Sequence, residues 1–462
     1  MLQFAMNQMR MKLSDQGQLV SNLCYRSFRS SSNRKIRPDP PRTNAKPDMR
    51  EPNPFVVKLK EMHDADDAIS LFNEFREMGY KHDYPSYSAL IYKLARSSRY
   101  EAVHMLLDYI RKRGIRCKEP LLLGVIVHYG KARLVDKAVD LFNQMPKFNC
   151  TRTLQSLNTL INVLVENGRF VDAKDVFDRA HKMGFRKNAV TFNIIIKGCL
   201  EKGDWEQACN VFDEMLERKV QPSVVTYNSL IGYLCKKSDF DQAMRLFEDM
   251  KEKHKHPNAV TYAILMDGLC SLGKYKEAKK LMFDMEYRGC KPRLVNFGVL
   301  MSDLGTRGEI EEAKSLLSEM KQKRLQPDVV IFNILINNLC KGEKVAEAYK
   351  ILVDMQIKGC EPNAVTFRTM VDGFCRVRDF DGGLKILNAM LLSEHCPRLE
   401  TFCCLVKGLF DSGKTDDAAF VLEEMRKRNL RLDSQAWESC LMDACSKNRA
   451  PSELINELIT VN

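Results

Sequence analysis

The side chains that could carry out catalysis or bind a metal are scattered along this chain of 462 residues. Its eight histidines form no cluster in the sequence. Two acidic pairs, Asp66-Asp67 and Asp416-Asp417, each stand just before a recurring alanine, where the first turn of a helix is expected. A helix dipole stabilises carboxylates at that position, so a structural role accounts for both pairs. The sequence predicts no catalytic site, and we expect the protein not to be an enzyme.

The sixteen cysteines could suggest disulfides or a zinc site, but no C-x-x-C pair occurs. Cysteine recurs instead at intervals of 35 residues or multiples of 35, at Cys235, Cys270, Cys340 and Cys375. Such a recurrence indicates that cysteine packs as a small apolar residue. We expect neither a metal nor a cofactor.

Asparagine recurs at the same interval, and its amide can both donate and accept hydrogen bonds. The run V-T-Y-N at 225–228 follows V-T-F-N at 190–193 by 35 residues. The repeat runs from 49 to 433 without an insertion or deletion, as eleven units that start at residues 49, 84, 119, 154, 189, 224, 259, 294, 329, 364 and 399. A shortened twelfth unit or cap follows at 434–462. A strict period of this size predicts a stacked solenoid whose function lies on a long repeated surface.

Each unit is predicted to form two helices joined by a turn. We number the residues of a repeat by their place, from the first to the last (thirty-fifth). The fourth place is mostly aromatic, the twentieth mostly Ala, the twenty-fourth large and apolar, and the twenty-seventh often Met, all of which indicate core. Gly203-Asp204 reads as the end of one helix followed by the N-cap of the next. Prolines such as Pro222 and Pro257 are expected to end the second helix.

The tetratricopeptide pattern shares the Ala and the apolar residue four places later, but its period is 34 and its first helix carries Trp and Leu-Gly. This chain has a period of 35, an aromatic residue followed by Asn, and a late Met. It resembles the pentatricopeptide repeat family, in the P-class form that consists of 35-residue repeats alone. The resemblance implies an all-α fold, a right-handed superhelical solenoid of helix-turn-helix repeats. The H-x-E and C-x-x-C motifs of a cytidine-deaminase domain, which some members add, do not occur here.

The resemblance also implies a partner and a mechanism, in which each repeat recognises one base of single-stranded RNA. In the family, the side chains at the fifth and last places meet the base edge. The pairs that fit the family pattern are Asn53 with Asp83, Asn158 with Asn188, Asn193 with Ser223, Asn228 with Asn258, and Asn333 with Asn363. The first resembles a uracil pair, the third a pair leaning to cytosine, and the other three resemble pyrimidine pairs. The implied RNA is U-N-N-Y-Y-Y-N-N-Y-N-N, because the pairs of repeats 2, 3, 7, 8, 10 and 11 depart from the pattern. The structural alternative is that these asparagines merely start helices.

Two further columns of residues complete the implied site. The second place packs against the base face in the family, and it is apolar in Val190, Val225, Val260, Val295, Val330 and Val365. The thirteenth place faces the RNA backbone in the family, and it is basic in Arg96, Lys131, Lys236, Lys341 and Arg376. A basic residue at the end of a first helix can equally serve the helix dipole, so both readings stay open.

The net charge of +12 is unevenly distributed. Residues 1–48 contain nine Lys or Arg and three Asp or Glu, which leaves +6 on the rest of the chain. An Arg-rich, Ser-rich and acid-poor segment is typical of an organellar transit peptide followed by a disordered linker, and Arg26-Ser27-Phe28 favours the mitochondrion over the plastid. The alternative is a basic tail that binds RNA. The repeats themselves are no polycation, so any positive field must be concentrated on one face.

The predicted function is sequence-selective binding of an organellar transcript, in RNA stabilisation, processing, splicing or translation. The alternative is a protein-binding helical scaffold, for example a component of an organellar ribosome, and the six repeats without a family-like pair keep it open. No apolar stretch approaches the length of a membrane span, so no membrane association is expected.

Overall fold

The structure, a computed structural model, describes residues 53–62 and 64–428. These residues form 22 α-helices, one short 3-10 helix (η1, Met145–Phe148) and no β-strand. The first helices of successive pairs are α2 (Pro54–Glu61), α4 (Tyr84–Arg96), α6 (Glu119–Lys131), α8 (Leu154–Glu166), α10 (Ala189–Lys202), α12 (Val224–Lys236), α14 (Ala259–Ser271), α16 (Leu294–Thr306), α18 (Val329–Lys341), α20 (Ala364–Arg376) and α22 (Leu399–Asp411). The second helices are α3 (Ala65–Glu77), α5 (Tyr100–Lys112), α7 (Val135–Gln144), α9 (Phe170–Arg179), α11 (Trp205–Glu217), α13 (Phe240–Glu252), α15 (Tyr275–Tyr287), α17 (Ile310–Gln322), α19 (Val345–Ile357), α21 (Phe380–Leu392) and α23 (Thr415–Lys427). The predicted all-α repeat solenoid is confirmed.

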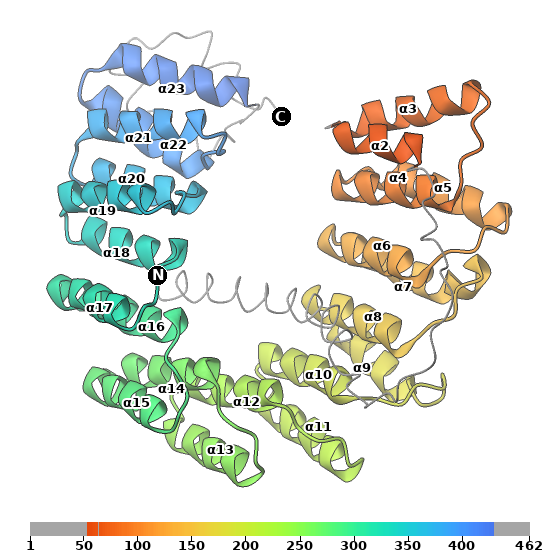
Figure 1. Cartoon of the computed structure of the whole chain (residues 1–462), viewed down its shortest axis with the longest axis horizontal. Coiled ribbons are helices and arrows are strands. Elements are labelled where there is room, and N and C mark those ends of the chain that lie inside the picture. Colours follow the sequence, from red (N-terminus) through yellow and green to blue (C-terminus); the bar gives the residue numbers. More distant parts are fainter. Residues whose placement is uncertain (1–52, 63, 429–462) are drawn as a thin grey trace, which may run out of the picture. The chain divides into compact units, whose positions relative to one another are not determined.

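The described chain divides into two compact units. One holds residues 53–233 and Arg245–Lys255, and the other holds Leu234–Met244 and residues 256–428. Within each unit the helix pairs stack one on the next (Figure 1). Within a unit, a first helix packs against its own second helix and against the neighbouring first helices, as α16 does with α17, α14 and α18. The first helices of a unit therefore form a continuous layer, on which the fifth-place residues recur.

The first helices begin where the sequence period predicts. From α4 onward every one starts at the first residue of its repeat, and the preceding last-place residue is its N-cap wherever a cap is assigned. The first repeat differs, because α2 begins only at Pro54 and Asn53 is its N-cap. The expected turn at Gly203-Asp204 is confirmed, since Gly203 ends α10 in the left-handed conformation and Asp204 caps α11.

Three columns of the predicted core are fully or nearly buried. The fourth-place aromatics, the twentieth-place alanines and the twenty-seventh-place methionines are at most 7% exposed. The small alanines let the two helices of a pair approach closely, and the aromatics and methionines fill the space around them. The twenty-fourth place is less uniform, because Phe212 and Leu317 are only half-buried. The recurring cysteines at the twelfth place are buried as well, as predicted for small apolar residues.

The expectation that prolines end the second helices is wrong. Helix α11 ends at Glu217, five residues before Pro222, and Lys219 then adopts a left-handed conformation with φ of 56°. The same place has positive φ in the first ten repeats, although Gly fills it in only five of them. The left-handed residue turns the chain out of the helix, and the proline lies in the linker that follows.

A close approach between α16 and α18 gives a stability prediction. A Cβ on Gly305 would lie 1.9 to 2.1 Å from the amide atoms of Asn338, whose Nδ2 donates to the Met301 carbonyl at 2.9 Å. Asn338 is 4% exposed, so it has no room to withdraw. We expect Gly305→Ala to lower the free energy of unfolding by about 1–3 kcal/mol.

Denaturant unfolding checks this prediction. Adding Asn338→Ala to Gly305→Ala should restore part of the loss. Gly298→Ala on the same helix is the control, because a Cβ there would lie 3.4 Å from its nearest neighbour, Ile334 Cδ1, which is an ordinary contact distance. Equal losses from the Gly305 and Gly298 variants would show that helix geometry, and not the Asn338 contact, sets the effect.

No helix among the described residues has both the length and the apolar character needed to cross a membrane. The transit peptide and linker predicted at 1–48 and the shortened twelfth repeat predicted at 434–462 lie outside the described residues. The boundaries of the repeat array stay predictions.

Candidate nucleic-acid interface

In repeats 1, 5 and 9 the fifth-place and last-place side chains lie next to each other, although 30 residues separate them in the sequence. In repeat 5, Asn193 Nδ2 donates to Ser223 Oγ at 3.2 Å. In repeat 9, Asn333 Nδ2 lies 3.4 Å from Asn363 Oδ1. The layered first helices cause this proximity, because the last residue caps the first helix that packs beside the fifth residue.

In repeat 4 the pair is joined through a third side chain. The Thr191 hydroxyl lies 2.8 Å from Asn158 Oδ1 and 3.1 Å from Asn188 Oδ1. The two asparagines therefore belong to one hydrogen-bonded group. In repeat 6, Asn228 and Asn258 belong to different compact units, so their pairing stays a prediction.

The first pair has a different local structure. Asn53 Nδ2 donates to Asp83 Oδ1 at 2.9 Å, while its Oδ1 accepts the backbone N–H of Val56 at 3.1 Å. The pair is joined as the family pattern implies. Its amide, however, also serves as the N-cap of α2, which the other fifth-place asparagines do not do.

The asparagines at the last place start helices, which was the alternative explanation for their recurrence. Asn188, Asn258 and Asn363 are N-caps whose Oδ1 accepts backbone N–H groups of the following turn. Capping occupies the oxygen, and all three side chains remain exposed. Capping is therefore compatible with a second role of the amide nitrogen toward a ligand.

Exposure differs along the two columns that would meet a base. Asn158, Asn193 and Asn228 are half-buried, whereas Asn333 is only 5% exposed and least accessible. The second-place valines are all partly accessible, and Val225 is 48% exposed. An apolar side chain that reaches the surface beside a polar pair can contact the face of a planar ligand.

The five basic thirteenth-place residues are the last residues of α4, α6, α12, α18 and α20. The charges of these basic residues shift the pKa values of side chains near them. Burial and then the charges of Lys131 and Arg96 lower the pKa of His128. Burial and then Arg376 lower the pKa of Lys341. Two cations that repel each other in the free protein form a favourable place for an anion.

Lys236 has different surroundings. Burial raises the pKa of Asp267, and the charge of Lys236 partly opposes this rise. The negative charge of Asp267 thus offsets part of the positive charge of Lys236. Among the pairs outside the family pattern, burial and then the charge of Arg398 lower the pKa of Arg368, whereas the carboxylates of Asp372 and Glu400 oppose this shift.

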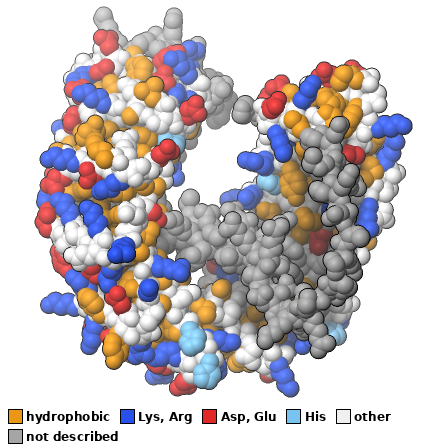
Figure 2. All heavy atoms as spheres, in the orientation of Figure 1, with side chains coloured by type: hydrophobic (Ala, Val, Ile, Leu, Met, Phe, Trp, Pro, Cys, Tyr) orange, Lys and Arg blue, Asp and Glu red, His pale blue; other side chains and the backbone are white. Residues whose placement is uncertain are grey.

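The surface as a whole is mixed in charge. Figure 2 shows Lys and Arg side chains interspersed with Asp and Glu over the described residues. This distribution agrees with the modest net charge of the repeats and makes the placement of individual cations more important than their number.

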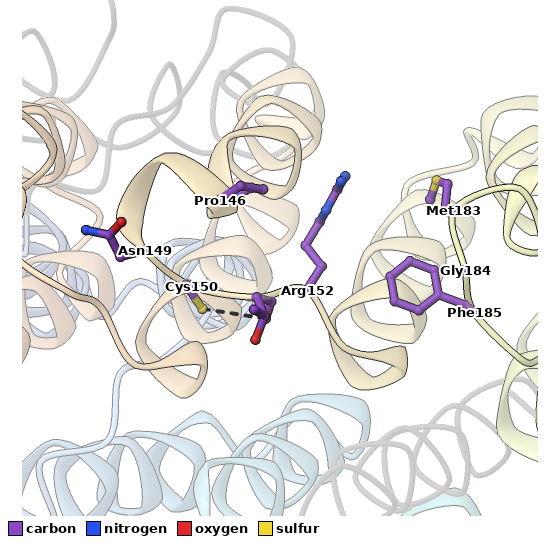
Figure 3. Close-up of a pocket in the computed structure, with 8 residues that line it drawn as sticks. Pro146, Asn149, Cys150, Arg152, Met183, Gly184 and Phe185 are labelled. Carbon is purple, nitrogen blue, oxygen red and sulfur yellow. Dashed lines mark hydrogen bonds between the residues drawn. The ribbon is translucent and has the colours of Figure 1, made fainter.

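A surface hollow formed by two successive linkers contains no catalytic combination (Figure 3). Its lining residues are Pro146, Asn149, Cys150, Thr151, Arg152, Met183, Gly184 and Phe185. The Arg152 guanidinium lies 5.3 Å from the centre of the Phe142 ring, and the Cys150 thiol is 3.8 Å from the Thr151 carbonyl. We assign no function to this hollow.

The sequence reasoning did not identify the third-place hydroxyls as part of the polar pairs. Thr191, Thr226 and Thr366 are fully buried and contact the fifth-place asparagine of the preceding repeat. Their recurrence in the V-T-Y-N run was visible. A role in the site was not, because only the stacking of one repeat on the next brings the two residues together.

Comparison with known proteins places this geometry in context. A family model described as PPR repeat family matches residues 152–201, 187–231, 222–271, 257–295, 292–341 and 327–376. A second, described as PPR repeat, matches residues 85–115, 124–150, 365–394 and 400–430. Together these matches cover well over half of the chain.

Curated relatives share parts of the sequence. A mitochondrial pentatricopeptide repeat-containing protein of Arabidopsis thaliana is 55% identical over 173 residues, which are 36% of this chain and 37% of that protein. Another mitochondrial pentatricopeptide repeat-containing protein of Arabidopsis thaliana is 30% identical over 123 residues, which are 26% of this chain and 23% of that protein. The matched segments thus span well under two thirds of these relatives.

Among solved structures, the pentatricopeptide repeat protein PPR10 from maize aligns with 87% of this chain and 67% of its own, at 20% identity and a TM-score of 0.43. The same protein in complex with an 18-nt psaJ RNA element aligns with 81% of this chain and 59% of its own, at 21% identity and a TM-score of 0.48.

Proposed function

Because the chain belongs to the pentatricopeptide repeat family, we propose that it binds single-stranded RNA by base sequence, one base per repeat. The RNA pattern proposed is U-N-N-Y-Y-Y-N-N-Y-N-N. Binding, and not catalysis, is the proposed activity.

The observation that carries the proposal is the contact between fifth-place and last-place side chains. Asn193 with Ser223 and Asn333 with Asn363 each form a joined polar pair beside a partly exposed valine. A planar base needs an apolar surface for its face and directed polar groups for its edge. The pair and the valine supply both within one repeat.

We further propose that the protein acts in mitochondria on an organellar transcript. Two of the relatives are named as mitochondrial, and the first 48 residues have the composition of a transit peptide. Protection of the RNA, processing, splicing and translation are all compatible with bound single-stranded RNA. A plastid location remains the alternative.

Alanine substitution of two neighbouring base-contacting residues tests the function. In the full chain, Asn193→Ala and Asn228→Ala should each weaken the preference for pyrimidine over purine at one position, the fifth and sixth of the pattern. The loss of discrimination should be about 1–3 kcal/mol per position. Competition binding with RNAs that differ at one nucleotide measures it.

The control is Asn210→Ala, which removes an exposed asparagine from α11 of the same repeat. It should leave both base preferences unchanged. If the Asn193 and Asn228 variants keep the wild-type preferences, base recognition by the fifth place is excluded.

A protein-binding scaffold, for example in an organellar ribosome, is the second candidate. Three apolar residues spaced four apart, Tyr349, Val353 and Ile357, lie on one face of α19 and are 47%, 36% and 77% exposed. Exposed apolar stripes can mark contacts with other proteins. Under this alternative, the Asn193 and Asn228 variants would have no effect on partner binding, whereas Ile357→Asp would weaken it.

A further inference from the structure

Three buried threonine hydroxyls connect consecutive repeats at the fifth-place asparagines. Thr191 Oγ1 lies 2.8 Å from Asn158 Oδ1. Thr226 makes the same contact with Asn193 Oδ1, and Thr366 makes it with Asn333 Oδ1, each at 2.7 Å. All three threonines occupy the third place of the following repeat and are 0% exposed, so water does not compete for the bond.

Each hydroxyl also has a fixed partner on its other side. The backbone N–H of the last-place residue donates to Oγ1, from Asn188 at 3.3 Å, Ser223 at 2.9 Å and Asn363 at 3.1 Å. A hydroxyl has a single hydrogen to donate. The contact with the fifth-place Oδ1 is shorter than the 3.1 Å contacts with Asn188 Oδ1, Ser223 Oγ and Asn363 Oδ1, so the hydrogen points to the fifth place.

This chain of bonds fixes which end of the amide is engaged. The backbone N–H donates to the threonine, and the threonine donates to the Oδ1 of the asparagine. The Nδ2 group, with its two N–H donors, then remains for the last-place side chain and for a ligand. Without the hydroxyl, the two ends of the amide could exchange places at little energetic difference.

We propose that the third-place threonine of each following repeat is a positioning residue that orients the fifth-place amide, so that Nδ2 faces the RNA base. This inference rests on the proposed function. An N–H donor held in that direction favours a base that presents an acceptor there. Both pyrimidines carry the O2 carbonyl, so a donor held in this direction can bind either one without a choice between cytosine and uracil.

The sequence pairs the two residue types. All five fifth-place asparagines of the family-like pairs are followed by Ser or Thr at the next third place, namely Ser86, Thr191, Thr226, Thr261 and Thr366. After Ser88, Ala263, Gly298 and Cys403 the same place holds no hydroxyl. Two hydroxyls occur without an asparagine partner, Ser156 after Leu123 and Thr401 after Arg368, and these provide controls.

The asparagine amide of the first repeat is oriented the other way. There Asn53 donates from Nδ2 to Ser86 Oγ at 3.0 Å, because its Oδ1 is occupied by the N-cap bond to Val56. The amide is thus reversed relative to repeats 4, 5 and 9, and the proposal concerns those three repeats.

The test uses the full chain with Thr226→Val, which keeps the side-chain shape and removes the hydroxyl, and with Thr226→Ser, which keeps the hydroxyl. Competition binding compares RNAs with a pyrimidine or a purine at the fifth position of the pattern. Thr226→Val should reduce the ratio of the two affinities about fivefold at that position alone, the usual effect of one lost hydrogen bond. Thr226→Ser should retain the ratio, and Thr401→Val should retain it at every position.

An unchanged ratio in Thr226→Val, or an equal loss of affinity for all RNAs, overturns the proposal, because a structural role alone would give that result. If Thr226→Val does not fold, as circular dichroism would show, Thr366→Val in the other compact unit provides the same test at the ninth position. A wild-type protein without any base preference would instead reject the proposed function itself.

Discussion

Replacing Phe297 by alanine is expected to lower the free energy of unfolding by about 3–5 kcal/mol. Phe297 is the fourth-place aromatic of α16 and is 0% exposed within a cluster of buried apolar residues. The truncation removes apolar contacts and leaves a cavity that the surrounding helices cannot fill completely. Because a repeat contacts mainly its neighbours, the decrease in stability should be largest in repeats 7 to 9.

Denaturant unfolding followed by circular dichroism measures the total loss, and hydrogen exchange locates it. The matched control is Phe283→Ala on α15, where the same side chain is 53% exposed. Its effect should stay within about 0.5 kcal/mol. Comparable losses from both variants would contradict the assignment of the fourth place as the core.

Removing two neighbouring thirteenth-place cations, with Lys341→Ala and Arg376→Ala together, should weaken binding to every RNA by the same factor. Burial and then the charge of Arg376 lower the pKa of Lys341 in the free protein, so the two cations act on the same stretch of surface. For single-stranded RNA the salt slope should fall by about 0.7 per lost contact, and the affinity near 150 mM salt should fall roughly tenfold.

Binding measured over a range of salt concentrations checks this result. The control is Lys350→Ala with Lys385→Ala, which removes the same charge from exposed positions on α19 and α21. The control pair should leave the salt slope unchanged. An equal decrease from both pairs would mean that overall charge, and not the thirteenth place, governs binding.

The period of the sequence was sufficient to predict most of the fold. Helix starts from α4 to α22 follow the repeat starts, and last-place residues such as Asp83 and Asn188 cap their first helices in register. Buried aromatics, alanines and methionines followed from their spacing, since burial is the main reason for such columns. The ends of the second helices could not be predicted from the sequence pattern. Residues such as Lys219 and His254 are left-handed there without the usual glycine signal.

The candidate site was predictable in its members but not in its hydrogen bonds. The joined pairs Asn193 with Ser223 and Asn333 with Asn363 depend on how one first helix packs against the next. The same packing buries Asn333 to 5% exposure and brings Thr366 to its amide. The sequence of one repeat predicts neither the burial of Asn333 nor its bond with Thr366, because both depend on the packing of two consecutive repeats.

The most direct test of sequence-selective RNA binding is selection from a random pool of single-stranded RNA by the full chain at near-physiological salt. We expect enrichment of three consecutive pyrimidines with a uracil three positions before the first of them, as in U-N-N-Y-Y-Y. Failure to enrich any sequence, or enrichment of sequences without the pyrimidine run, would contradict the proposal and favour the protein-binding scaffold.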